Sequence, residues 1–348
     1  MQEEKGLSRR GFMGTAGGAA ALGALGPLAA TAGASGGRDR DRHGHDHDDD
    51  RHGKGDLPLS RIGMQLFTVR DLLADNELDL PGTFEMLADA GYAEVEIGGS
   101  FDGRTAAEFR ALANQYGLKP EGSHVPGGGT SWRTAREQIF ADAAALGLKY
   151  VGIASPPSGV APTHDGYRAM AEEFNTWGAE ARQHGLRFYF HNHPPDFTLD
   201  GGTPIYDTLL EETDRRLVWF ELDIAWIEAG GQSAYDYLKD DPSRYPLFHV
   251  KDLRWADDGP RVTPATVAQP NRRYWLTDVG KGDIDFPRIF SAVRDVDDHH
   301  YFVEHDDAPD DETASGTAPR PRNPAGSANT SWTSRKYLAE LEVRRRRH

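Results

Sequence analysis

The sequence predicts a (β/α)₈ barrel over residues 57–348, in which eight parallel strands form an inner ring and a helix follows each strand. Three observations predict this fold. Eight short apolar segments alternate with eight segments whose apolar residues recur at helical spacing. The short segments are almost continuously apolar, which is typical of strands buried on both faces. No glycine-rich phosphate-binding motif follows the first strand, which argues against the alternative of a doubly wound open sheet.

The eight expected strands are rich in aliphatic and aromatic residues. They lie at residues 61–67, 93–99, 118–125, 149–155, 186–193, 216–226, 245–252 and 299–306. Successive side chains of a strand point to opposite faces, so every second residue should face the barrel interior.

The expected helices carry recognisable start and stop signals. They lie at residues 80–92, 105–117, 131–147, 167–185, 204–213, 233–240, 285–296 and 331–343. Pro81 suits a first helical turn, Thr105 suits an N-cap, and Gly91, Gly117 and Gly147 suit helix ends. Two long segments, 253–283 and 307–331, interrupt the alternation. Both follow the carboxyl ends of strands, so we expect them to be lids over an active site.

Residues 1–34 are expected to be a twin-arginine signal peptide. Arg9 and Arg10 precede a weakly apolar run rich in Gly and Ala that ends in small residues with A-x-A spacing. A membrane anchor is the alternative, but the glycines and Pro27 make the run a poor spanning helix. We therefore expect the twin-arginine export machinery as a partner, no stable membrane insertion after cleavage, and a periplasmic or extracellular location.

Residues 35–56 are expected to be a disordered linker rich in His and Asp. Residues 36–56 include no apolar side chain, so the segment cannot bury surface to offset its chain entropy. Its four histidines could hold a transition metal weakly, but a solvated tether is the expected role.

Composition excludes several classes of function. The net charge is −16, and a body this acidic repels phosphate backbones, so nucleic acid is not an expected partner. The chain has no cysteine, which excludes disulfides, thiolate metal sites and thiol nucleophiles.

Polar side chains recur at the carboxyl ends of the expected strands, where they would point into one site. They are Gln65, Glu96, His124, His191, His193, Asp223, His249, Lys251, Asp252, Glu304 and His305. Imidazoles and carboxylates that converge from several strands suit one divalent ion such as Mn²⁺, Zn²⁺, Co²⁺ or Mg²⁺. Any one of them could instead hydrogen-bond a neighbouring carbonyl, so the prediction rests on their recurrence.

Alternation along the strands separates expected ligands from their neighbours. His191 and His193 share one face of the fifth strand. On the sixth strand, Glu221 lies on the same face as Asp223 but deeper in the barrel. We therefore expect Asp223 to bind the ion and Glu221 to support the ligands.

Several motifs resemble those of the sugar phosphate isomerase/epimerase superfamily, the barrels related to xylose isomerase, in the branch with a His-Asn-His fifth strand. The resemblance covers nearly all of residues 61–340. It is carried by "IGMQLFTVR", "AGYAEVEIGG", "YFHNHPPDF", "LDGGTPIYDTLLEETD", "FELDIAW", "HVKD", "VGKGDIDFPRIF" and "FVEHD".

This resemblance implies a barrel that binds one divalent ion through a Glu, Asp, His and Glu set from strands five to eight. Asp223, His249 and Glu304 match three of these positions. The fourth departs from the pattern, because His191 stands where ketose epimerases carry a Glu. That departure puts a symmetric exchange of a proton between two glutamates in doubt.

The resemblance further implies a metal-dependent sugar isomerase or epimerase that acts through an enediolate. The metal ligands would be His191, Asp223, His249 and Glu304. Glu304 or Glu96 would serve as the base, with Lys251 beside it as a further catalytic residue. Substrate oxygens would be bound by His124, His193 and Lys251, and Trp226 would stack on a sugar face or pack beneath a lid.

Three alternatives to this reaction are considered. An exported lyase or hydrolase of 3-keto-glycosides fits the expected export, because sugar phosphates are cytoplasmic. A sugar-binding barrel without catalysis is disfavoured, since pure binding needs no Lewis acid. The superfamily's abasic-site endonucleases need a basic rim for DNA, which the acidic charge argues against.

Overall fold

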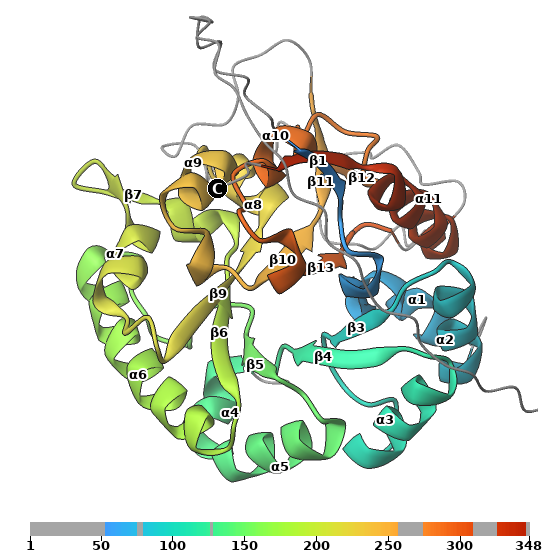
Figure 1. Cartoon of the computed structure of the whole chain (residues 1–348). Helices are drawn as coiled ribbons and strands as arrows, with labels where there is room; N and C mark the ends of the chain where they lie inside the picture. The colour runs from blue at the N-terminus through green and yellow to red at the C-terminus, as the bar shows by residue number, and fades with distance from the viewer. Residues whose placement is uncertain (1–52, 75–78, 126–127, 257–273, 309–325, 346–348) are drawn as a thin grey trace, which may run out of the picture. The chain divides into compact units, whose positions relative to one another are not determined.

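The computed structural model describes residues 53–74, 79–125, 128–256, 274–308 and 326–345. Its largest sheet has eight parallel strands in the spatial order β4-β3-β2-β13-β10-β9-β6-β5. A parallel bridge between His124 and Gly152 joins the two ends of this sheet, which makes it a nearly closed barrel (Figure 1). The strands are β2 Ile62–Gln65, β3 Glu94–Ile97, β4 Lys119–Ser123, β5 Tyr150–Ile153, β6 Arg187–His191, β9 Val218–Asp223, β10 Leu247–Val250 and β13 His300–Val303. The predicted barrel is confirmed.

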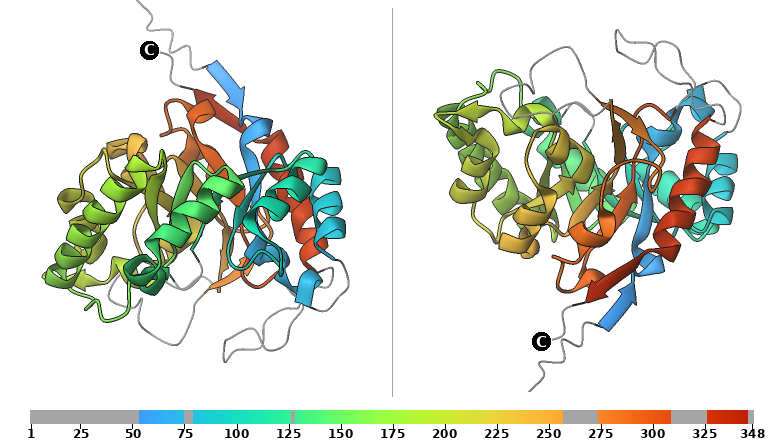
Figure 2. Two further views of the ribbon diagram at one scale, coloured as in Figure 1. Left: turned by 90° about the horizontal axis from the view of Figure 1, so that it is seen from below. Right: turned by 90° about the horizontal axis from the view of Figure 1, so that it is seen from above.

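Helices surround the strands on the outside (Figures 1 and 2). They are α1 Arg70–Ala74, α2 Leu80–Asp89, α3 Ala106–Gln115, α4 Gly128–Thr134, α5 Arg136–Leu146, α6 His164–Gln183, α7 Ile205–Glu212, α8 Ile224–Ala229, α9 Ala234–Asp240, α10 Phe286–Phe290 and α11 Gly326–Glu340. Among the described helices, none is both long and apolar enough to cross a membrane.

The residues predicted to begin and end helices form the expected capping contacts. The Thr105 side chain accepts from the backbone N–H of Glu108, and the Glu108 carboxylate accepts from the Thr105 N–H in return. Gly147 ends α5 in the left-handed conformation, with φ of 73°. The expected helix 131–147 is two helices, because Ala135 adopts φ −138° and ψ 30° between α4 and α5.

Two corrections concern the expected loops. Within 253–283, β11 Asp252–Trp255 pairs antiparallel with β12 Tyr274–Thr277, while 257–273 lies outside the described residues. Within 307–331, α11 already begins at Gly326, and 309–325 lies outside the described residues. A shorter hairpin pairs β7 Leu199–Asp200 with β8 Thr203–Pro204.

The ends of the described chain pair with each other. Strand β1, Gly53–Asp56, lies antiparallel to β14, Glu342–Arg345 (Figure 2). The prediction of a disordered linker is therefore wrong for residues 53–56. These residues have no apolar side chains, but their backbone pairs with β14. The last helix likewise ends at 340, before the expected 343. The expected signal peptide 1–34 and the linker residues 35–52 lie outside the described residues.

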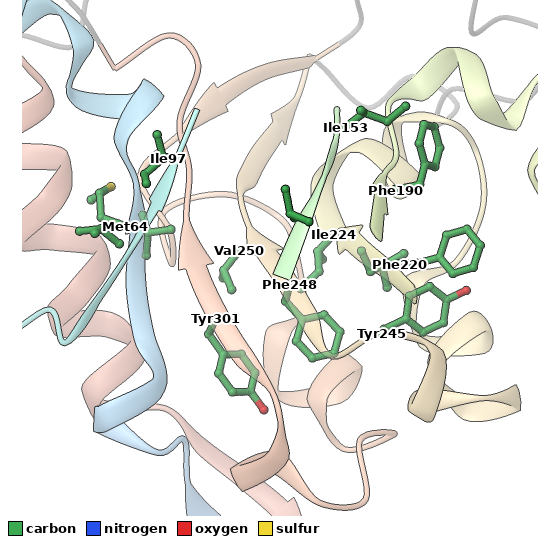
Figure 3. Close-up of a cluster of buried hydrophobic side chains, with 14 of the residues drawn as sticks. Met64, Ile97, Ile153, Phe190, Phe220, Ile224, Tyr245, Phe248, Val250 and Tyr301 are labelled. Atoms are coloured by element: carbon green, nitrogen blue, oxygen red, sulfur yellow. The ribbon is translucent and has the colours of Figure 1, made fainter. Parts of the chain in front are cut away.

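Alternate strand residues divide between two packed layers. Side chains that face the helices form a continuous buried cluster, which includes Met64, Ile97, Phe190, Phe220, Phe248, Val250 and Tyr301 (Figure 3). A smaller cluster of Tyr150, Tyr189, Leu247 and Phe302 fills the middle of the barrel. These four side chains fill the interior of the barrel, so a site at the carboxyl ends of the strands lies above a layer of packed side chains.

Candidate active site

Strand register stacks polar side chains in two levels at the carboxyl end of the barrel. His191 of β6 is level with Glu221 of β9, and His249 of β10 is level with Asp223. All four side chains are buried. The carboxylate Glu304 joins them directly after β13.

The four predicted metal ligands come together. One ligand atom each from His191, Asp223, His249 and Glu304 lies within 4.8 Å of all the others. His249 Nδ1 is 2.6 Å from Glu304 Oε2 and 3.9 Å from Asp223 Oδ2, and His191 Nε2 is 4.0 Å from Asp223 Oδ2. Nitrogen and oxygen donors in one buried cluster suit a borderline divalent ion.

A deeper level of carboxylates orients the imidazoles. His249 Nε2 lies 2.6 Å from Glu96 Oε2, and His191 Nδ1 lies 3.2 Å from Glu221 Oε2. Burial would raise the pKa of Glu96, but His124 and His249 hold it below its usual value, so Glu96 is an ionised carboxylate that accepts from His249 Nε2, while His191 Nδ1 faces the Glu221 carboxyl group. The opposite nitrogens, His249 Nδ1 and His191 Nε2, then face Asp223 and Glu304. This is the arrangement in which a supported imidazole presents its lone pair to a metal.

Protonation differs between the two imidazoles. Burial holds the pKa of His191 well below its usual range, and the neighbouring histidines and Lys251 act in the same direction. Burial alone would also lower the pKa of His249, but Glu221, Glu304 and Glu96 outweigh it and hold that pKa well above the usual range. His191 is therefore a neutral donor, whereas a metal bound at His249 must displace a proton.

One buried carboxylate oxygen, Glu221 Oε1, has no hydrogen-bond donor among the described residues. Asp223 Oδ1 accepts from the backbone N–H of Trp226 at 2.8 Å, and Oδ2 forms an ion pair with Lys251 Nζ at 3.0 Å. Burial raises the pKa of Asp223 to about 6 and that of Glu221 to about 7. Buried carboxylates that outnumber their donors and lie among imidazoles suit a divalent metal.

Lys251 supplies a fixed positive charge beside this cluster. Its Nζ lies 3.0 Å from Asp223 Oδ2, 2.9 Å from Glu304 Oε2 and 2.7 Å from Asp306 Oδ2, and the side chain is fully buried. Burial would lower the pKa of Lys251, but Asp223, Asp306 and Glu304 raise it well above the usual value. The group is an ammonium that can bind or stabilise an anionic oxygen.

His193 and Trp226 lie at the edge of the cluster. The His193 ring is 4.7 Å from that of His191, and its buried Nδ1 has no hydrogen-bond partner within the described part of the chain. Burial and then Lys251 lower the pKa of His193 to about 4, so it is a neutral imidazole. Trp226 lies on α8 rather than at a strand end, is 5% exposed, and carries Lys251 Nζ 4.2 Å from its ring.

Two of the other expected site residues lie against the imidazoles. Glu96 is fully buried beneath them and accepts from Tyr189 Oη, from Gln65 Nε2 at 2.6 Å and from His249. His124 Nε2 lies 2.8 Å from Glu221 Oε2, and the His124 ring lies 5.0 Å from that of His191 and 5.3 Å from that of His249. The His124 side chain is 12% exposed, against 7% for Glu304, so the structure places it beside the imidazoles.

Sequence reasoning missed two residues of this arrangement. Asp306 binds the Lys251 ammonium, and Tyr189 donates to Glu96. Tyr189 was detectable in principle, because it lies two residues before His191 on the same strand face. Asp306 follows the end of β13, where no strand period fixes the direction of a side chain.

Comparison with known families agrees with this fold. The model of a family described as xylose isomerase-like TIM barrel matches residues 84–323, more than half of the chain.

Individual relatives are more distant. Inosose dehydratase of Clostridium perfringens is 30% identical over 136 residues, which make up 39% of this chain and 44% of that protein, so the match spans less than half of the curated relative. A sugar phosphate isomerase/epimerase from Parabacteroides distasonis has a TM-score of 0.62 at 22% identity, covering 80% of this chain and 98% of that one. The IolI protein with a bound zinc atom has a TM-score of 0.55 at 15% identity, covering 79% and 95%. At these identities the two structures show a shared fold.

Proposed function

The chain belongs to the xylose isomerase-like TIM barrel family, and from this premise we propose that it is a divalent-metal-dependent enzyme acting on a carbohydrate or cyclitol. The proposed reaction removes a proton from the carbon next to a carbonyl and expels the substituent on the following carbon, which is a β-elimination. The observation that carries the proposal is the convergence of the buried side chains of His191, Asp223, His249 and Glu304.

The four converging side chains would hold the metal. When bound, the ion would polarise the substrate carbonyl and stabilise the negative charge that develops on its oxygen. Glu96 and Glu221 fix the imidazoles from beneath, so the ligand nitrogens are oriented before any ion arrives. The zinc in the IolI structure supports this site as a metal site.

Glu304 is the proposed base. Burial would raise its pKa, but Lys251 and His249 hold that pKa well below the usual range, so the group is a carboxylate at neutral pH. Its side chain is 7% exposed, against none for Asp223. Glu304 is thus the more accessible of the two carboxylates in the cluster. Lys251, 2.9 Å from it, would stabilise the departing oxygen.

Elimination is favoured over epimerisation by the identity of residue 191. Inversion of a carbon centre needs a second base on the opposite face of the sugar, and the side chain in that position is a buried imidazole, 1% exposed, whose Nδ1 is engaged by Glu221. Elimination needs one base, and Glu304 can return the proton that it removes to the departing oxygen, so that the expelled group leaves as a neutral hydroxyl compound. The similarity to an inosose dehydratase supports the same choice.

Aldose–ketose isomerisation is the second candidate. A neutral His193, whose Nδ1 has no hydrogen-bond partner among the described residues, could carry a proton between neighbouring carbons, which an isomerase requires. Turnover in deuterated water separates the two: an isomerase returns sugar labelled at carbon, while an eliminating enzyme releases the expelled group and a dehydrated product.

Metal content tests the proposal directly. The full chain, stripped and reloaded with Mn²⁺, Zn²⁺ or Co²⁺, should retain one ion more per chain than the variant Asp223→Asn. Asp240→Asn, the same change at an exposed carboxylate on α9, serves as the matched control and should retain as much metal as the parent. Equal metal in the parent and in Asp223→Asn would refute the site.

Export remains part of the proposal. We propose that residues 1–34 direct the folded protein through the twin-arginine machinery, as the paired Arg9 and Arg10 predict. Replacing both arginines by lysine should keep the protein in the cytoplasm, which cell fractionation would measure.

A further inference from the structure

Asp306 is the most exposed of the three carboxylates that surround Lys251. Its side chain is 29% exposed, against 7% for Glu304 and none for Asp223. Asp306 Oδ2 is buried and lies 2.7 Å from Lys251 Nζ, so the exposed surface belongs to the rest of the side chain, which carries Oδ1. Among the described residues, no hydrogen-bond donor is found for Oδ1. This oxygen is therefore open to a hydroxyl group of a ligand.

The backbone around Asp306 is held at three points. The His305 N–H donates to Thr68 Oγ1 at 3.2 Å. Arg70 Nη2 donates to the backbone oxygen of Asp306 at 2.7 Å, and the Asp307 N–H donates to His305 Nδ1 at 3.1 Å. An exposed carboxylate on a fixed backbone is preorganised, so it can bind a ligand without first losing conformational freedom.

Lys251 does not need Asp306 as a counter-charge. Asp223 Oδ2 and Glu304 Oε2 already lie 3.0 Å and 2.9 Å from its Nζ. A third carboxylate adds repulsion between like charges to a buried cluster, which costs stability unless a ligand or ion offsets it. Asp306 is also the one of the three that lies outside the proposed set of metal ligands. A role toward the substrate accounts for a carboxylate that the ion pair alone does not require.

Lys251 places Asp306 next to the departing oxygen of the substrate. In the proposed reaction Lys251 stabilises that oxygen, so the departing oxygen and Asp306 Oδ2 both lie within hydrogen-bond distance of one Nζ. Two acceptors of one tetrahedral ammonium are roughly 4–5 Å apart. A hydroxyl on the carbon next to the departing group lies between them, where it can donate to the Asp306 carboxylate.

We propose that Asp306 is a substrate-binding residue, whose carboxylate accepts a hydrogen bond from a hydroxyl on the carbon adjacent to the one that bears the departing group. The substrate class is a sugar or cyclitol in which the departing oxygen has such a vicinal hydroxyl. The proposal rests on the proposed function, because it takes Lys251 to bind the departing oxygen. A hydrogen bond to a charged group is about twice as strong as one between neutral groups, so a substrate without this hydroxyl binds more weakly.

The test uses the full-length, Mn²⁺-loaded protein and probes that differ by one hydroxyl: cyclohexane-1,2-diol, as its cis and trans isomers, and cyclohexanol. Broadening of the probe signals in proton NMR by bound Mn²⁺ measures binding beside the ion, even where binding is weak. The better diol isomer should bind about tenfold more tightly than cyclohexanol, from one hydrogen bond to a charged group. Asp306→Ala should abolish this preference. Asp306→Asn keeps an oxygen acceptor without the charge and should reduce the preference.

Asp240→Ala is the matched control, since it makes the same change at an exposed carboxylate on α9, and it should keep the preference of the parent. Asp306→Ala should leave the binding of cyclohexanol unchanged, whereas a role confined to pairing with Lys251 would change both probes alike and overturn the proposal. A parent that binds Mn²⁺ but favours neither diol isomer, or an Asp306→Ala variant that still does, also overturns the role of Asp306 alone. A parent that retains no Mn²⁺ counts against the proposed function, whichever probe binds.

Discussion

Replacing Lys251 by Met tests the charge balance of the site most directly. Methionine keeps most of the length and the apolar stem of the side chain, but it removes an ammonium that lies among three carboxylates and over the Trp226 ring. Asp223 has no exposed side-chain surface, Glu304 has 7% and Asp306 has 29%. Repulsion between these charges therefore operates mostly out of water.

The expected cost follows from this burial. Removing one partner of a buried ion pair costs about 3–5 kcal/mol, because the remaining charges stay desolvated and uncompensated. For a domain of this size each kcal/mol lowers Tm by about 2–4 °C, so Lys251→Met should melt roughly 10 °C below the parent when both are stripped of metal. Asp306→Asn, at the more exposed end of the network, should cost only about 1 kcal/mol.

Metal should then reverse much of the loss. In Lys251→Met, the ammonium no longer offsets the charges of Asp223 and Glu304, and among the described neighbours His249 is left to do so, so saturating Mn²⁺ or Zn²⁺ should stabilise this variant more than the parent. Urea unfolding with chelator and with metal measures both quantities. Equal unfolding free energies of parent and variant in chelator would refute the reasoning, and an equal gain from metal would show that Lys251 and the ion do not share these carboxylates.

Three further changes test the barrel around the site. Glu94→Gln removes a carboxyl group whose pKa is raised to about 7 by burial. The protonated Glu94 favours the folded state below about pH 4.5, and this stabilisation is lost as the pH rises through 7. Measured by urea unfolding, the unfolding free energy of the variant relative to the parent should therefore be up to about 3 kcal/mol more favourable at pH 8 than at pH 4.5. Gly152→Ala should cost about 3 kcal/mol in the same assay, since its Cβ would lie 2.2 Å from the backbone oxygen of Tyr189. Asp252→Asn should cost about 2–3 kcal/mol, because this carboxylate accepts four backbone N–H groups and an amide offers only one oxygen; an unchanged midpoint would contradict it.

The barrel could be predicted because its determinants are periodic. Alternating apolar strands and helices, and stop signals such as Gly147, each appear in a few neighbouring residues. Features that depend on distant partners could not be predicted in this way. Strand β1 exists through its pairing with β14 at the other end of the chain, and Gly53–Asp56 alone carries no strand signal.

In the candidate site, too, features set by local sequence could be predicted and features set by distant partners could not. Period-two alternation indicates that His191 and His249 point inward, and the structure brings them together with Asp223 and Glu304. Depth in the barrel is set by the stagger between strands, which no single strand reveals. For this reason Glu96 was expected beside the substrate, although it lies beneath His249.

The excess of carboxylates explains why one cation is insufficient here. Five acidic side chains meet around the imidazoles and a single ammonium: Glu96, Glu221, Asp223, Glu304 and Asp306. Burial raises the pKa of Glu221 to about 7 and Glu96 acts in the same direction, while Glu221, Glu304 and Glu96 outweigh burial and hold the pKa of His249 above its usual range. Both groups therefore hold protons more tightly than usual. A divalent ion provides the same compensation without those protons, and it does so at the donors that the deeper carboxylates already orient. The cluster is therefore better matched to a bound metal than to a purely structural network of hydrogen bonds.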